Sequence, residues 1–182
     1  MSFTTEHKQK FEDLLFQIKN QDRLQLQANG GNSILFSYPP EEESKYLEHT
    51  PEVFKDSAKF IDVSKLLVAF IEKDGWESFQ SYYESLSSTP HIIFKSDDPD
   101  PDLFDMIIKG ISEAIENDKI PILTRTGALL GTGIDNVNIM EHPEVMKSGH
   151  PLVIFYPSII KDDTLLFLNF KPASKYRCVL VK

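Results

Sequence analysis

Cysteine is nearly absent from the sequence, in which Cys178 is the only one among 182 residues. A lone thiol cannot form a disulfide within the chain, and it is too isolated to help bind zinc. Long apolar runs are missing too, and none approaches the roughly 20 residues that a transmembrane helix needs. The opening residues, MSFTTEHKQK, lack the apolar segment of a secretion signal. These absences predict a cytoplasmic protein without a membrane partner, in which Cys178 is a small buried side chain.

Positive charge is also scarce. The chain has 19 basic and 28 acidic residues, for a net charge of −9, which disfavours direct binding to the phosphates of nucleic acid. The balance reverses in residues 164–182, which carry four basic side chains and no acidic one. Two interpretations stay open for this segment: a basic docking face, or charges that keep an edge strand from pairing with other chains. We favour the second, and direct DNA contact is the least favoured function.

Length and composition, with 41% hydrophobic and 26% charged residues, predict one globular domain that spans residues 1–182. Apolar spacing alternates along it between strand-like runs and helical stripes. The predicted strands are 33–38, 60–63, 91–95, 120–124 and 151–156, and the predicted helices are 5–19, 41–49, 52–58, 64–71, 76–86 and 103–117. Two closing runs, 165–170 and 176–181, are predicted to pair as an antiparallel hairpin. The result is an α/β fold, a single three-layer domain with a mainly parallel sheet between two helical layers.

The segment between the second and third predicted strands is rich in apolar residues. Ser64 is the expected N-cap of its first helix, and residues 66–71 are apolar nearly all round, which predicts deep burial. Trp76, Phe79 and Tyr83 recur at helical spacing in its second helix. An aromatic stripe of this kind packs in a core far more often than it binds a cofactor. Both helices are therefore predicted as core elements.

The residues after the first strand exclude the usual phosphate site. Open α/β folds bind ligands beyond the carboxyl ends of their strands, and a nucleotide there needs glycines, free N–H groups and a lysine. This chain instead has Pro39 and Pro40, which lack N–H donors, and then the three acidic residues 41–43, which repel anions. The glycine-rich segment 127–133 matches neither the phosphate loop nor the dinucleotide fingerprint.

No other motif assigns a catalytic, cofactor-binding or metal-binding residue. The aspartates of 97–105 start like a calcium loop, but Leu103 and Lys109 stand where that loop needs glycine and glutamate. A magnesium site near Asp97–Asp102 stays conceivable, although acids at a helix start usually stabilise the helix. The alternative to a non-catalytic protein is thus a nucleotide- or metal-dependent enzyme that uses Asp97–Asp102 or Arg125.

Two further features attract attention at strand ends. Arg125 follows the fourth predicted strand, and it would lie beside the acidic residues 41–43 if the first and fourth strands were neighbours; an exposed ion pair there would stabilise little. Tyr156-Pro157 is matched by Tyr176-Arg177 near the end of the chain. Tyrosine and arginine are enriched at interface hot spots, while tyrosines near strand ends are more often half-buried packing groups.

From residue 120 onward the chain resembles the BrxB-like family of bacterial BREX phage-defence systems. The residues that carry the resemblance are PLVIFYP at 151–157, DDTLLFLNF at 162–170 and KYRCVLV at 175–181, with weaker similarity at ILFSYP (34–39) and 123–130. Tyr156, Pro157, Tyr176 and Arg177 match the closing motif, and Tyr38 and Pro39 match the weaker one. The chain departs from the pattern at Ser158, which replaces a glycine, and near residues 134–136, where the family carries an arginine and a histidine.

The resemblance implies a small, non-catalytic adaptor without a cofactor, which contacts a PglZ-type phosphatase-like protein and other BREX components. It also implies an α/β fold similar to the core of P-loop NTPases but without the Walker A loop. The seven residues that we single out as interface or motif positions are therefore Tyr38, Pro39, Arg125, Tyr156, Pro157, Tyr176 and Arg177.

Overall fold

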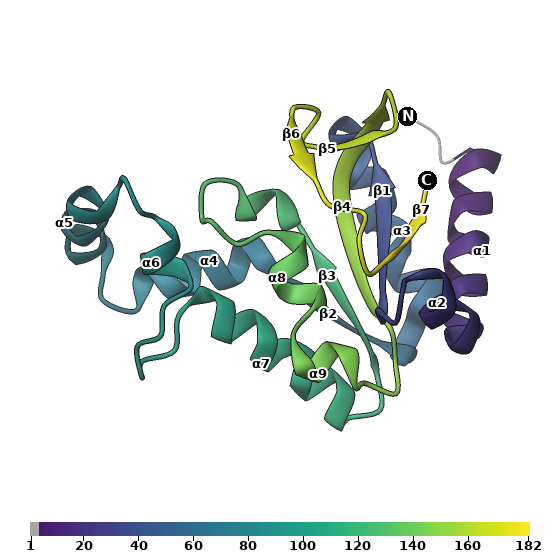
Figure 1. The fold of residues 1–182 in the computed structure, drawn as a ribbon, viewed down its shortest axis with the longest axis horizontal. Coiled ribbons are helices and arrows are strands. Elements are labelled where there is room, and N and C mark those ends of the chain that lie inside the picture. Colours follow the sequence, from purple (N-terminus) through teal and green to yellow (C-terminus); the bar gives the residue numbers. More distant parts are fainter. Residues whose placement is uncertain (1–3) are drawn as a thin grey trace.

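A computed structural model describes residues 4–182 (Figure 1). Within this range the chain forms an α/β structure with a seven-stranded mixed sheet, and about half of it is helical. Five strands run parallel in the order β2-β3-β4-β1-β7. The other two, β5 and β6, extend from β4 as antiparallel strands. This order differs from both the dinucleotide-binding and the flavodoxin-like doubly wound orders.

The elements have the following bounds. The strands are β1 (Ser33–Tyr38), β2 (Ala58–Asp62), β3 (Ile120–Thr124), β4 (Leu152–Lys161), β5 (Thr164–Phe167), β6 (Lys171–Ala173) and β7 (Val179–Val181). The helices are α1 (Thr5–Lys19), α2 (Gln21–Gln27), α3 (Glu43–Phe54), α4 (Val63–Glu72), α5 (Trp76–Leu86), α6 (His91–Phe94), α7 (Leu103–Glu116), α8 (Asn136–Met140) and α9 (Pro143–Met146). Short 3-10 turns are η1 (Pro40–Glu42), η2 (Lys55–Ser57) and η3 (Thr126–Leu129).

Strand β1 lies inside the sheet, between β4 and β7, and all six of its residues are buried. Its short apolar run predicted this position, because a parallel strand that is covered on both faces needs no polar side. Successive side chains of a strand point to opposite faces. Accordingly Leu35 joins the apolar cluster on one face of the sheet, and Ile34 and Phe36 join the cluster on the other.

Helices pack on both faces of the parallel strands (Figure 1). On one face, α1 and α3 build an aromatic cluster in which the Phe36 ring lies 5.3 Å from Phe11, 5.2 Å from Tyr46 and 4.8 Å from Phe155. On the other face, α7 lies across β2 and β3, and Gly110 lets it approach closely, since a Cβ there would stand 3.2 Å from Ile61.

The end of the chain differs from its prediction. The run 176–181 does not pair with 165–170: its last part forms β7, which joins β1 in parallel, while β4 continues to Lys161 and turns back into β5. The turn is Asp162-Asp163, in which both residues have positive φ (48° and 63°), as two-residue hairpin turns of type I′ require. The antiparallel unit is therefore β4-β5-β6, and β7 belongs to the parallel sheet.

The segment between β2 and β3 also differs from its prediction. Residues 91–95 were expected to form a strand, and 91–94 form helix α6 instead; four apolar residues alone do not distinguish the two structures, and Pro90 suits a helix start. The N-cap of α4 is Asp62, and Ser64 donates a hydrogen bond to its carboxylate. Helices α4, α5 and α6 reach past the edge of the sheet as an arm (Figure 1).

Burial in this arm is far lower than we predicted. Val63 is the only buried residue in Val63–Glu72, and none of the residues Trp76–Leu86 is buried. Val68 is 52% exposed and Trp76 is 62% exposed. The reason is geometric, because α5 lies beyond the sheet and meets other elements on one side only.

Helix α3 (43–54) joins most of the predicted helix 41–49 to the start of the predicted helix 52–58 and contains Pro51; the rest of 52–58 is the 3-10 turn 55–57 and the first residue of β2. Tyr46, Thr50 and Phe54 form its buried stripe at intervals of four residues, so packing holds the helix together across the proline. The polar segment 21–32 contains the short helix α2. No helix within residues 4–182 is long and apolar enough to cross a membrane.

Candidate functional site: an aromatic groove beside the sheet

The carboxyl edge of the parallel strands is occupied by the chain itself. Strand β4 does not end at Pro157, because Ser158 continues it and pairs with Phe167 of β5. Tyr156 stacks on Phe167 with ring centroids 4.7 Å apart, and the Leu168 N–H donates to the Pro157 carbonyl at 2.8 Å. The β5-β6 hairpin thus lies where an open α/β fold leaves a ligand crevice.

Tyr38 and Pro39 stand at the same edge. Tyr38 is 1% exposed, lies beside Pro157 in the β1–β4 register, and donates a hydrogen bond to a Glu43 carboxylate oxygen at 3.0 Å. Burial, followed by the negative charge of Glu43, raises the pKa of the Tyr38 hydroxyl well above its ordinary value. Tyr38 is therefore a neutral, buried packing group rather than an exposed contact residue.

Arg125 lies at the end of β3, as predicted, but its partner is different. Strands β1 and β3 are separated by β4, and the Arg125 guanidinium faces Asp62, with Nε 3.6 Å from Oδ2. Arg125 has a left-handed backbone (φ 53°) and a half-exposed side chain beside a cavity of about 360 Å³. Its partner Asp62 also accepts bonds from the Lys65 N–H and the Ser64 hydroxyl.

The aspartates near the start of α7 act as a helix cap. Asp102 is 4% exposed; its carboxylate accepts from the Asp105 N–H while its own N–H donates to the Asp105 carboxylate, which makes a capping box, and it also accepts from the Ser96 N–H. Asp97, Asp98 and Asp100 are exposed. Within residues 4–182, no three His, Cys, Asp or Glu side chains gather closely enough to hold a metal ion.

The basic residues of the C-terminal segment are largely paired with acids of this chain. Lys171 contacts Asp135, and Lys175 contacts Asp163 at 3.0 Å. Arg177 lies 3.2 Å from Glu141, and its Nη1 donates to the Asn29 carbonyl at 3.4 Å. These pairs leave little free positive charge for a basic docking face.

The two tyrosine motifs do not form one surface. Tyr156 is 4% exposed, and burial raises the pKa of its hydroxyl. Tyr176 is 51% exposed, with the Arg177 guanidinium 5.3 Å from its ring. The closing segments thus combine buried packing residues with two exposed aromatic side chains, Tyr176 and Phe170, which is 63% exposed.

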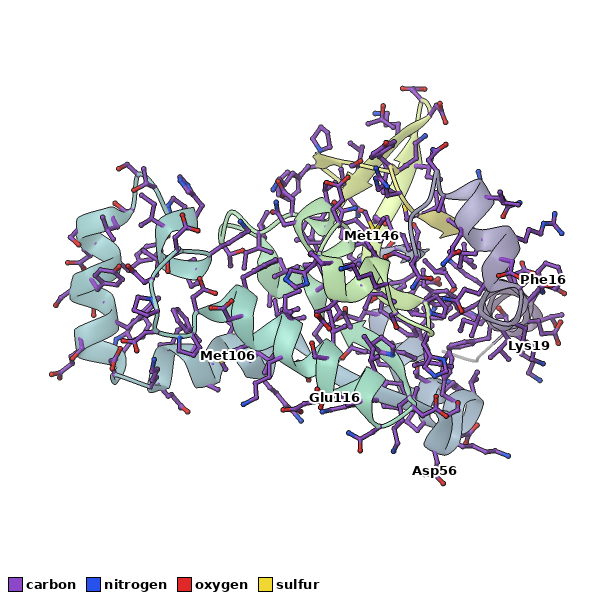
Figure 2. The ribbon with its side chains drawn as sticks, turned by 60° about the horizontal axis from the view of Figure 1, so that its bottom comes forward. Phe16, Lys19, Asp56, Met106, Glu116 and Met146 are labelled. Carbon is purple, nitrogen blue, oxygen red and sulfur yellow. The ribbon has the colours of Figure 1, made fainter. Side chains whose placement is uncertain are left out.

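The exposed apolar surface gathers on the arm, around a groove of about 300 Å³. Helices α4, α5 and α6 form one wall and the segment after β3 forms the other. We call this cavity the aromatic groove, and its lining is Leu67, Ile71, Trp76, Phe79, Tyr83, Phe94, Ala128, Leu130, Gly131 and Thr132. Figure 2 shows the arm beyond Met106, on the side of the molecule away from Phe16 and Lys19.

Aromatic rings give the groove a firm base. Phe94 is 5% exposed, and its ring lies 6.1 Å from Phe79 and 6.4 Å from Tyr83. Phe79 in turn lies 6.3 Å from Trp76 and 6.0 Å from Tyr83. Rings at these separations stabilise one another, so the side chains that face solvent are held in place before any ligand arrives.

Local sequence explains how the two walls meet. Gly75 is the N-cap of α5, and its positive φ of 80° lets the chain change direction between α4 and α5. Gly133, with φ 77°, brings the second wall against α6 so closely that a Cβ there would stand 2.6 Å from the His91 Cβ. Thr132 is 3% exposed, and its hydroxyl donates to the Leu129 carbonyl and accepts from the Ile134 N–H.

Acidic residues surround the aromatic residues in the sequence of the arm. Residues 72–100 contain seven acidic and two basic residues, for a net charge of −5. All seven acids are exposed; they are Glu72, Asp74, Glu77, Glu84, Asp97, Asp98 and Asp100. The arm that carries the apolar groove therefore has a net negative charge.

Comparisons with protein-family models, curated proteins and solved structures found no match to this chain. The geometry alone therefore defines the class of site, an exposed apolar groove on a protruding helical arm.

Sequence reasoning found the aromatic stripe of α5 but assigned it to the core. The sequence did hold a signal for exposure of this stripe: the helix lies between Gly75 and the loop 87–90, and no strand next to it in the chain packs over its aromatic side chains. Leu130 and its neighbours carried no such signal, because only the fold brings them to the arm.

Proposed function

We propose that this protein is a non-catalytic binding module, an adaptor that holds a partner protein in its aromatic groove. The observation that carries the proposal is the exposure of Trp76 (62%), Leu130 (43%) and Tyr83 (36%) around one concave apolar site. Exposed apolar patches of this kind mark interaction sites, and tryptophan and tyrosine dominate the energetics of protein interfaces.

The low burial of α5 supports a binding role over a structural one. A helix that exists to complete a core buries its apolar stripe, whereas Phe79 and Leu86 of α5 are only partly buried against the core and Trp76 is exposed. The neighbouring rings are already ordered by mutual contact, which lowers the entropy lost when a partner binds.

We further propose that the complex is a BREX-type phage-defence assembly and that the partner is the PglZ-type protein. This part rests on the resemblance of the closing segment to the BrxB-like family. In the same proposal, the five parallel strands correspond to a P-loop NTPase core in which Pro39 and the β5-β6 hairpin replace the phosphate site. The central position of β1 supports that correspondence, since a phosphate loop follows a buried strand of this kind.

Size-exclusion chromatography of this chain with a purified PglZ-type protein at micromolar concentration tests the proposal. We expect co-elution, and we expect Trp76→Ala to abolish it. Phe16→Ala is the matched control, because Phe16 is a similarly exposed aromatic residue (49%) on α1, away from the arm (Figure 2). Separate elution of the wild-type proteins contradicts the BREX assignment. A complex that survives Trp76→Ala unchanged contradicts the role of the aromatic groove.

A further inference from the structure

The aromatic groove has few polar atoms with which a ligand could form hydrogen bonds. Apart from the indole and phenol groups, the only polar side chain in its lining is Thr132. Its hydroxyl is already paired at 2.8 Å with the Leu129 carbonyl and at 3.1 Å with the Ile134 N–H. A segment that binds here must therefore bring its backbone polar groups already satisfied.

A helix meets that requirement, because its N–H and C=O groups pair within the helix. An extended or polyproline segment instead leaves its backbone groups to water or to the receptor; aromatic-lined grooves can bind such segments too, so a proline-containing peptide is the competing case in the test below. Strand addition needs an exposed sheet edge, whereas helices and the segment after β3 line this groove. The chemistry of the walls thus favours an amphipathic helix whose apolar face enters between them.

The negative charge of the arm restricts which helices could bind in the groove. Glu77 and Glu84 stand directly next to the groove residues Trp76 and Tyr83 in the sequence, and residues 76–86 contain no lysine or arginine. A helix with acidic flanks would be repelled, while lysine or arginine beside the apolar anchors would be attracted.

We propose that the aromatic groove binds an amphipathic helix of the partner protein that carries basic residues on both sides of its apolar stripe. The inference rests on the proposed adaptor function and adds the chemical class of the bound segment. The helix places apolar anchors at i, i+3 or i+4, and i+7 against the groove, as helix-in-groove complexes do.

The test uses the full chain and designed peptides, with Trp76 as the reporter because it is the only tryptophan in the sequence. Three peptides share one set of leucine anchors: a helical peptide with lysine flanks, the same peptide with glutamate flanks, and the lysine peptide with a central proline. We expect a saturable change of Trp76 fluorescence with the first. We expect binding that is about tenfold weaker with the second, from two or more rim charge pairs.

Charge reversal on the protein supplies the complementary test. The double variant Glu77→Lys and Glu84→Lys should bind the lysine peptide about tenfold more weakly than wild type does, and it should regain affinity for the glutamate peptide. Glu116→Lys is the matched control, because Glu116 is an exposed acid at the end of α7 that is remote from the arm (Figure 2), and it should change neither affinity.

Equal binding of the lysine and glutamate peptides overturns the basic-helix inference, and so does stronger binding of the proline peptide. Retention of the PglZ-type complex by Trp76→Ala is a separate result that overturns the groove as the adaptor site. A partner lost with Trp76→Ala, together with no binding of the lysine peptide, leaves the adaptor function standing and refutes the helix.

Discussion

Gly133 joins the second wall of the aromatic groove to the arm, and replacing it with alanine should open the groove. Its φ is 77°, which costs a side chain about 1 kcal/mol. In addition, the new Cβ would stand 2.6 Å from the His91 Cβ and 2.9 Å from the His91 Cα. No rotamer change can move a backbone atom away, so the segment 128–133 must shift away from α6.

Gly131 offers a matched control within the same segment. Its φ is 82°, but no described atom lies within 4 Å of a Cβ built there. Gly131→Ala therefore carries the backbone strain without the collision. We expect a loss of about 1 kcal/mol in the free energy of unfolding for Gly131→Ala. For Gly133→Ala the collision adds about 1–3 kcal/mol.

Urea denaturation monitored by circular dichroism measures both losses of stability, and titration with the lysine peptide measures the affinity of the groove for that peptide. Gly133→Ala should lose binding, while Gly131→Ala, which lies in the groove lining, is the control for stability only. Equal losses of stability in the two variants would show that His91 does not touch the segment, and the packing of the groove walls would then be wrong.

Three further substitutions test other parts of the fold. Gly31→Ala would place a Cβ 2.1 Å from the Arg177 carbonyl oxygen; urea denaturation should show a loss of about 2–3 kcal/mol, with faster hydrogen exchange in β7. Asn32→Ala removes a fully buried amide that donates to three carbonyls in α9 and in the loop between α9 and β4, and should cost about 2–3 kcal/mol by the same assay. Burial lowers the pKa of Lys10 from 10.5 to about 8, so the unfolded chain binds more protons between these values. The stability of wild type relative to Lys10→Met should therefore rise by about 3 kcal/mol from pH 7 to 10.5, and a flat difference would contradict this.

The parallel strands β1, β3 and β4 could be predicted because their signals are local and concentrated. The run at 34–36 is apolar and short, and it forms a strand that is buried on both faces; the runs at 120–124 and 152–156 behave in the same way. The helices 5–19 and 103–116 follow their apolar stripes almost to the residue. In these segments the periodicity and the tertiary burial agree.

The arm and the closing segment could not be predicted because their signals depend on distant partners. A short run such as 91–94 suits either a helix or a strand until its neighbours are known. The run at 179–181 is apolar enough for either an antiparallel hairpin or a parallel place beside β1. Exposure of Trp76 follows from the place of α5 beyond the sheet, which no local pattern records.

The location of the aromatic groove follows from the same topology that fills the ligand crevice at the carboxyl ends of the parallel strands. Helix α4 leaves the carboxyl end of β2 at Val63, and η3 leaves the carboxyl end of the neighbouring strand β3 at Thr126. The two walls of the groove are thus the connections that follow adjacent parallel strands, which is the source of ligand sites in open α/β folds. Since the β5-β6 hairpin occupies the space above β4, these connections extend sideways and meet beside the sheet. A groove built in this way is lined mainly by apolar side chains from helices α4, α5 and α6 and from the segment after β3, so it suits an apolar protein segment better than a phosphate.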